Sequence, residues 1–205
     1  MMQKISIYIS EKLTISKVDK QAGYSCQPKT TDELIEILID RLEKDKDADL
    51  NDIDVSHIED MSYLFDCLDP HDIDISQWDV SNVKNMYGMF KGCNRFNSDL
   101  SQWDVSNVTD MRYMFFHCEE FNSDLSQWDV SNVTNMCAMF YNCLDLKSDL
   151  SQWDVSHVEN TCYMFGDCKS FNSDLSQWDV SNVTNMNYMF FCCSSLKNKP
   201  AWYKG

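Results

Sequence analysis

The stretch S-Q-W-D-V-S-N-V-T-N-M, residues 126–136, returns with few changes every 25 residues from Ser76 onward. Its tryptophans are Trp78, Trp103, Trp128, Trp153 and Trp178. The segment after it, M-x-x-M-F-x-x-C, keeps the same period, with phenylalanines at 65, 90, 115, 140, 165 and 190 and cysteines at 93, 118, 143, 168 and 193. A fixed period of about 20–50 residues indicates a solenoid, in which each unit buries its apolar face against its neighbours.

Each repeat contains two patterns of apolar residues. The segment D-L-S-Q-W-D-V-S alternates apolar and polar residues, which predicts a short strand. The segment N-M-x-x-M-F-x-x-C-x-x-F has apolar residues at three- and four-residue steps, which predicts a short α or 3-10 segment. We therefore expect an α/β fold, a right-handed solenoid with a parallel sheet on one side and a short helix or 3-10 turn in each repeat.

The pattern divides the chain into three parts. Residues 1–50 are expected to hold a strand at Lys4–Leu13 (a short helix is the alternative), a linker, and a helix that caps the solenoid. That helix should begin at a capping box formed by Thr30 and Glu33. Residues 51–200 hold about six repeats, and residues 201–205 form a C-terminal tail in which Trp202 or Tyr203 closes the end.

The acidic charge of the chain lies in the repeats. The formal net charge is −16, and residues 51–205 contribute −14 of it, from 9 basic and 23 acidic residues. Such a surface repels phosphate backbones, so we expect no direct nucleic-acid binding and a basic protein as the partner. The sequence shows no signal peptide and no apolar run of about 18 residues, and we expect a monomeric cytoplasmic protein without membrane contact.

The motif W-D-V-S-N-V-T-N-M-x-x-M-F-x-x-C-x-x-F-N-S-D-L-S closely resembles the 25-residue repeat of BspA-like leucine-rich repeat proteins. The resemblance covers residues 51–200, and P-K-T-T-D-E-L also looks like the N-terminal region of short family members. It implies a leucine-rich-repeat-like solenoid and protein binding or adhesion, with no shared catalytic residues. Many members of that family are exported to the cell surface.

The ten cysteines do not have the spacing of a zinc site. No C-x₂₋₄-C pair that would favour zinc is present, and Cys137/Cys143 and Cys162/Cys168 are six residues apart. The cysteines are expected to be reduced, with the repeat-phased thiols stacked in the core as small hydrophobic groups. We expect no metal and no cofactor.

Two columns of aspartate recur with the repeat. Asp104 and its equivalents precede V-S-N-V-T, and their carboxylates can cap that turn. The second column has a weaker local role, and it is either another structural column or an exposed stripe for recognition. Variable positions on the predicted helical side are either merely solvated or specify the partner. The predicted partner-binding residues are Asp74, Asp99, Asp124, Asp149, Asp174, Arg112, Phe116, Glu119 and Tyr141.

No Ser-His-Asp set, nucleophile elbow or Gly-rich phosphate loop is visible in the sequence. We therefore expect a non-enzymatic protein-interaction module that presents its parallel-sheet face and an aspartate stripe to a basic protein. One alternative is an intracellular inhibitor that mimics nucleic acid, for example against a host defence nuclease. The other is an adhesin-like surface protein.

Overall fold

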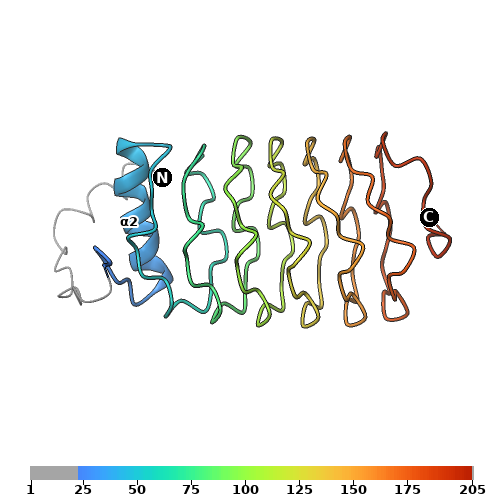
Figure 1. Ribbon diagram of the computed structural model, residues 1–205, viewed down its shortest axis with the longest axis horizontal. Coiled ribbons are helices and arrows are strands. Elements are labelled where there is room, and N and C mark those ends of the chain that lie inside the picture. Colours follow the sequence, from blue (N-terminus) through green and yellow to red (C-terminus); the bar gives the residue numbers. More distant parts are fainter. Residues whose placement is uncertain (1–22, 205) are drawn as a thin grey trace.

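The computed structural model describes residues 23–204, which wind into a row of similar coils (Figure 1). The helix α2, Thr31–Lys44, lies at one end of the row and the C-terminus at the other. Neighbouring coils are joined by parallel backbone bridges between residues 25 positions apart, at Asp60, Asn85, Asp110, Asn135, Asn160 and Asn185. One 25-residue repeat therefore makes one coil. The strand expected at Lys4–Leu13 lies outside the described residues.

The prediction of a strand and a short helix in each repeat is wrong. Between residues 23 and 204, α2 is the only helix, and the coils meet in isolated bridges rather than in a sheet. The α/β, leucine-rich-repeat-like solenoid and its parallel-sheet face are therefore not what the structure shows. The expected capping helix is present.

The segment expected to be helical is a zigzag of turns. In the third coil, alternate backbone N–H groups donate to a carbonyl 24 residues further along, in the next coil; these are the N–H groups of Met111, Tyr113, Phe115 and His117, at 2.8–3.1 Å. The N–H groups between them donate three residues back within the coil, those of Met114, Phe116 and Cys118. An α-helix needs bonds four residues back. The chain instead places Tyr113 and His117 in the left-handed region, at φ 57° and 62°.

The segment expected to be a strand has the right burial pattern but the wrong backbone. Leu100, Trp103 and Val105 are buried and Asp99 and Asp104 are exposed. The aspartates bend the chain, because their side chains accept the N–H two residues later, at 2.9 and 3.0 Å. A turn closed by an aspartate side chain removes the N–H from any ladder between coils.

Side chains join the coils along this segment instead of the backbone. The indole N–H of Trp128 donates to the carbonyl of Leu100, 28 residues earlier and one coil away, at 2.9 Å. The hydroxyl of Ser123, which is buried, accepts the N–H of Leu100 at 2.8 Å. The same indole bond recurs at Trp78, Trp103, Trp153 and Trp178.

The core is a set of stacked columns that runs through the coils. The rings of Phe65, Phe90, Phe115, Phe140, Phe165 and Phe190 stack with centroids 5.0–5.8 Å apart. The repeat-phased thiols are part of the same core, and that of Cys118 donates to the carbonyl of Phe90 at 3.0 Å. Each coil thus buries aromatic area against its neighbours, and such burial stabilises by about 25 cal/mol per Å².

The first coil is covered by α2. Leu34, Leu38 and Leu42 are buried along one face of the helix. Thr30 accepts the N–H of Glu33 at 3.2 Å, as expected, but the Glu33 carboxylate accepts the N–H of Lys29 rather than that of Thr30. The predicted capping box is therefore half formed as expected and half shifted by one residue.

The last complete coil is covered by the tail. The indole of Trp202 stacks on that of Trp178, with centroids 6.4 Å apart, and donates to the carbonyl of Leu175 at 2.9 Å. Tyr203 contacts Phe190, with centroids 5.0 Å apart. Trp202 thus takes the place of a repeat tryptophan, and the prediction that Trp202 or Tyr203 closes this end is confirmed by both contacts.

We predict that Trp128→Phe lowers the free energy of unfolding by about 1–3 kcal/mol, because it removes an indole bond between coils and leaves a small cavity. Chemical denaturation followed by far-UV circular dichroism measures the change. Gln127→Ala, an exposed neighbour, is the control and should change stability by less than about 0.5 kcal/mol. Equal stabilities of the two variants would contradict the role given to the indole.

Candidate functional site

Two aspartate columns make an acidic face. We define this acidic face by the exposed carboxylates of Asp74, Asp99, Asp124, Asp149 and Asp174 in one column and Asp79, Asp104, Asp129, Asp154 and Asp179 in the other. Asp54 continues the second column but is buried, so it is not part of the face. The two columns are five residues apart in each coil and flank the buried tryptophan.

Both columns close turns in the same way. Asp104 accepts the N–H of Ser106 at 3.0 Å, which confirms the predicted cap. Asp124 accepts the N–H of Ser126 at 2.9 Å, so the view that its column has a weaker local role is wrong. Asp74, Asp99, Asp149 and Asp174 make the same bond. Every predicted aspartate is therefore a turn residue whose carboxylate is also exposed.

These bonds favour the charged carboxylates. The backbone N–H and then the hydroxyl of Ser126 lower the pKa of Asp124 below its ordinary value. For Asp104 the hydroxyl of Ser106 lowers the pKa most, followed by its N–H. A hydrogen bond to a carboxylate stabilises the ionised form. The acidic face is therefore negatively charged at neutral pH.

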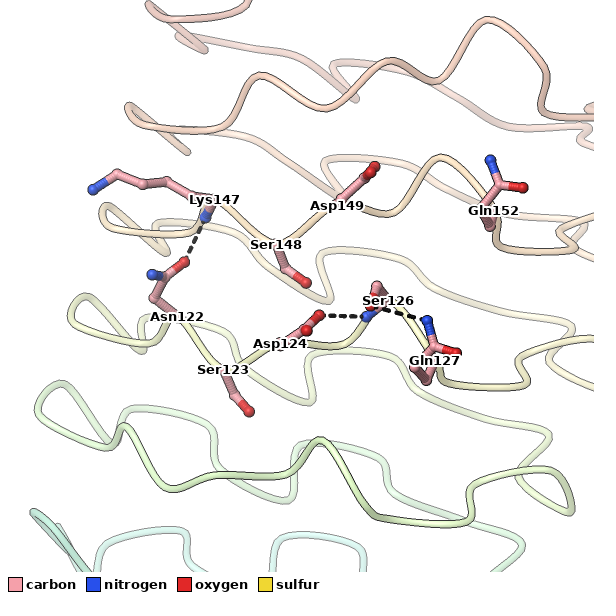
Figure 2. A pocket seen from close by; sticks show the side chains of 9 residues that line it. All are labelled: Asn122, Ser123, Asp124, Ser126, Gln127, Lys147, Ser148, Asp149 and Gln152. Carbon is pink, nitrogen blue, oxygen red and sulfur yellow. Dashed lines mark hydrogen bonds between the residues drawn. The ribbon is translucent and has the colours of Figure 1, made fainter.

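An open depression crosses the acidic face between two coils (Figure 2). It measures about 490 Å³ and is lined by Asn122, Ser123, Asp124, Ser126, Gln127, Lys147, Ser148, Asp149 and Gln152. Figure 2 shows Lys147 extending away from Asp149, and no ion pair joins Lys147 to a carboxylate of the described residues. The depression is polar and shallow, and its lining includes no histidine or cysteine.

A second surface feature is a row of aromatic side chains, of which the sequence analysis predicted only Phe116 and Tyr141. Eight aromatic side chains, defined here as the aromatic ridge, contact one another from coil to coil with centroids 4.9–6.3 Å apart: Tyr63, Tyr87, Tyr113, Phe116, Tyr141, Tyr163, Tyr188 and Phe191. Four of them are clearly exposed: Tyr63, Tyr163, Tyr188 and Phe191. The signal available in the sequence was the tyrosine two residues before the repeated phenylalanine, which recurs in four coils at Tyr63, Tyr113, Tyr163 and Tyr188.

The other four predicted site residues belong to this second surface or lie beside it. Phe116 stacks on Tyr141, with centroids 5.2 Å apart. Arg112 lies over the ring of Tyr87 at 4.7 Å, and Glu119 accepts a bond from the amide of Asn142 at 3.1 Å. The structure thus places these four residues, which the sequence analysis chose from variable positions, on one side of the coils.

The acidic face and the aromatic ridge lie on opposite sides of the core. In the second and third coils the ring of Phe90, from the segment that carries the ridge, contacts the ring of Trp103, from the segment that carries the aspartates. Both rings are buried. The aspartates and the group around Arg112 are therefore two surfaces and not one site.

Cys137 and Cys162 form a disulfide, which corrects the prediction of free thiols for these two residues. They occupy equivalent positions in adjacent coils, with Cα atoms 4.8 Å apart. The other eight cysteines are free. Burial raises the pKa of the Cys118 and Cys143 thiols well above the ordinary value, which keeps them protonated and unreactive.

No group of three or more histidine, cysteine, aspartate or glutamate side chains that could hold a metal ion occurs in residues 23–204. In the same part of the chain, no helix has the length and apolar content needed to span a membrane.

A family model described as "Mycoplasma protein of unknown function, DUF285" matches the chain twice, at residues 36–143 and 117–203. No curated protein and no solved structure matches the chain.

We predict that Asp124→Ala lowers the free energy of unfolding by about 0.5–2 kcal/mol, the usual effect of a lost cap, and that Asp104→Ala does the same. Asp124→Asn should keep the stability, because the amide oxygen can accept the same N–H from Ser126. Thermal melting of the three variants measures this. A harmless Asp124→Ala would show that its bond does not stabilise the turn.

The same caps predict weaker folding in acid. The folded pKa of Asp124 and Asp104 is lowered, so their stabilising effect is complete above the unfolded pKa of about 3.9 and is lost as the pH falls through the folded pKa. Urea denaturation between pH 6 and pH 2 should show this loss, and it should be smaller in a double Asp104→Asn/Asp124→Asn variant.

We predict that a thiol reagent labels the exposed Cys67 and Cys192 in the native protein, eight cysteines after denaturation, and all ten after reduction. Buried thiols with a raised pKa react only when the coils open. Mass spectrometry of the labelled protein counts the modified residues. Ten labels without reduction would contradict the disulfide.

Proposed function

The chain belongs to the family described as Mycoplasma protein of unknown function, DUF285, and we propose that it is a non-enzymatic protein-binding scaffold whose acidic face binds a basic protein. The observation that carries this proposal is a comparison of turns within the chain. A third column makes the same turn, and there it is closed by asparagine at Asn85, Asn135, Asn160 and Asn185 and by aspartate at Asp60 and Asp110. The turn therefore needs an acceptor oxygen but not a charge.

The acidic face nevertheless has aspartate at all ten of its positions. Like charges about 4 Å apart repel by about 1 kcal/mol in water, and asparagine would close the turns without that cost. The turns therefore do not explain the negative charge, and we attribute it to a role of the exposed surface. A basic protein would offset the repulsion, since complementary charges steer encounter and exclude wrong partners.

The form of the acidic face also favours binding over catalysis. The carboxylates are held in similar turns, and the lowered pKa of Asp124 and Asp149 keeps both ionised. A pair of carboxylates that acts as acid and base needs environments that separate the two pKa values. The open depression between these residues suits the surface of a protein better than a small substrate.

A second candidate is an adhesin-like surface protein, and the disulfide between Cys137 and Cys162 favours it. Disulfides persist in oxidising surroundings and are rare in a reducing cytoplasm. We propose with it that the repeats are of the BspA-like kind, on the evidence of the shared W-D-V-S-N-V-T-N-M motif. Under this reading the basic partner is a surface or matrix protein and the location is not the cytoplasm.

The test is a triple Asp99→Asn/Asp124→Asn/Asp149→Asn variant, which should keep its turns and lose three charges. The wild-type and variant proteins are immobilised, and proteins captured from cell lysate and from an extracellular-matrix extract are identified by mass spectrometry at 50 mM and 500 mM salt. We expect basic proteins on the wild type at low salt and at least a fivefold loss on the variant.

The captured class separates the alternatives. Matrix proteins would support the adhesin, and nucleic-acid-binding proteins would support the nucleic-acid mimic. A melting temperature equal to that of the wild type shows that the variant is folded. Equal capture by both proteins at low salt would exclude the acidic face as the binding surface.

A further inference from the structure

The aromatic ridge is built by matched residues in adjacent coils. Gly88 and Gly166 are small where neighbouring coils place larger residues, and a Cβ on either would lie within 3 Å of a tyrosine ring from the preceding coil, that of Tyr63 or of Tyr141. Each glycine therefore leaves the space in which that ring lies against the next coil. Both glycines therefore accommodate a ring of the ridge.

Tyrosine on the ridge also occupies unfavourable backbone positions. Tyr63, Tyr113, Tyr163 and Tyr188 have φ of 55–57°, the left-handed region that favours glycine. Gly88 has the same conformation at the equivalent position, so the coil itself accepts glycine there. The same backbone conformation recurs at His117, Ala138 and Asn142, so it belongs to the zigzag of the coils and is not special to the ridge.

Cations of the chain itself lie over two rings of the ridge. Near its N-terminal end the ridge already carries cations, with the ammonium of Lys91 at 5.7 Å from the Tyr63 centroid and the guanidinium of Arg112 at 4.7 Å from the Tyr87 centroid. A cation over an aromatic face within about 6 Å is attracted by the ring quadrupole.

Near the other end the rings lack such partners. Tyr163, Tyr188 and Phe191 are 37%, 57% and 46% exposed, and no cation of residues 23–204 lies over any of them. Asp167 lies beside this part and, after burial, is the main cause of the raised pKa of Tyr141. The surface thus combines open aromatic faces with a carboxylate.

We infer that Tyr163, Tyr188 and Phe191, with Asp167, bind arginine or lysine side chains of a cationic polypeptide segment, as Tyr63 and Tyr87 bind Lys91 and Arg112. The inference rests on the proposed function in one respect, that the partner is basic. It assigns the part of the ridge at Tyr163, Tyr188 and Phe191, rather than Tyr63 or the acidic face, as the surface that recognises individual side chains of the partner. The acidic face attracts the same partner by charge at longer range.

The probe is octa-arginine, with octa-citrulline as its uncharged analogue, and binding is measured by isothermal titration calorimetry at 50 mM and 500 mM salt. We expect Tyr163→Leu/Tyr188→Leu to weaken octa-arginine binding about 5- to 30-fold at 500 mM salt, the loss expected for two cation–π contacts. Net charge is unchanged in this variant, and octa-citrulline should bind neither protein.

Two control variants guard the interpretation. Tyr188→Gly removes a ring at φ 57°, where glycine is unstrained, so it should keep the melting temperature and still weaken binding. Tyr63→Leu removes a ring that is already occupied by Lys91, and it should leave octa-arginine binding within twofold of the wild type.

The inference is overturned if Tyr163→Leu/Tyr188→Leu binds octa-arginine within twofold of the wild type at 500 mM salt, or if octa-citrulline binds as well as octa-arginine. The triple asparagine variant of the acidic face separates this failure from failure of the proposed function. That variant should weaken binding at 50 mM salt and have little effect at 500 mM salt. If only the triple variant loses octa-arginine binding, the acidic face is the binding surface and the inference fails. If only the tyrosine variant loses it, the ridge is the binding surface and the proposed function fails.

Discussion

The structure depends on a ladder of backbone hydrogen bonds in which alternate N–H groups of one coil donate to carbonyls 24 residues later. Tyr113 donates to Cys137 at 3.0 Å and Phe115 to Met139 at 2.9 Å, and the same offset recurs in the neighbouring coils. This ladder sets the distance between coils. Equivalent residues of successive repeats are therefore neighbours in space, and any side chain that recurs becomes a column: phenylalanine inside, aspartate on one surface and aromatic rings on the other.

Side chains also join the coils, through hydrogen bonds that run to the preceding coil. The indole of Trp128, the thiol of Cys118 and the amide of Asn107 each donate to a carbonyl of the preceding coil. A coil therefore leaves polar groups unsatisfied on both of its faces until its neighbours are in place. Unpaired buried donors and acceptors cost about 1–3 kcal/mol each, so one repeat cannot fold alone and the array is stable as a whole.

The sequence predicted which residues are inside much better than it predicted the backbone. The period placed the repeated tryptophan, phenylalanine and cysteine in the core, and all of them except the partly buried Cys193 are buried there. The prediction of a helix in each repeat was wrong because the zigzag of turns at 111–118 points the same residues inward as a helix would. The left-handed tyrosines could not be predicted, since propensity argues against them. The disulfide had a signal that was missed: Cys137 and Cys162 are one full period apart.

The two surfaces differ in how their residues can have arisen. Duplication of one repeat would also produce uniform aspartate columns, so the argument for function is their charge, which the asparagine turns of the third column show to be unnecessary for folding. The aromatic ridge combines a repeated tyrosine, at Tyr63, Tyr113, Tyr163 and Tyr188, with residues that differ from coil to coil. Tyr63 lies against Gly88 and Tyr141 against Gly166, so a large residue in one coil is matched by a small one in the next. Each glycine is thus a departure from the repeat that leaves room for a ring on the surface rather than in the core.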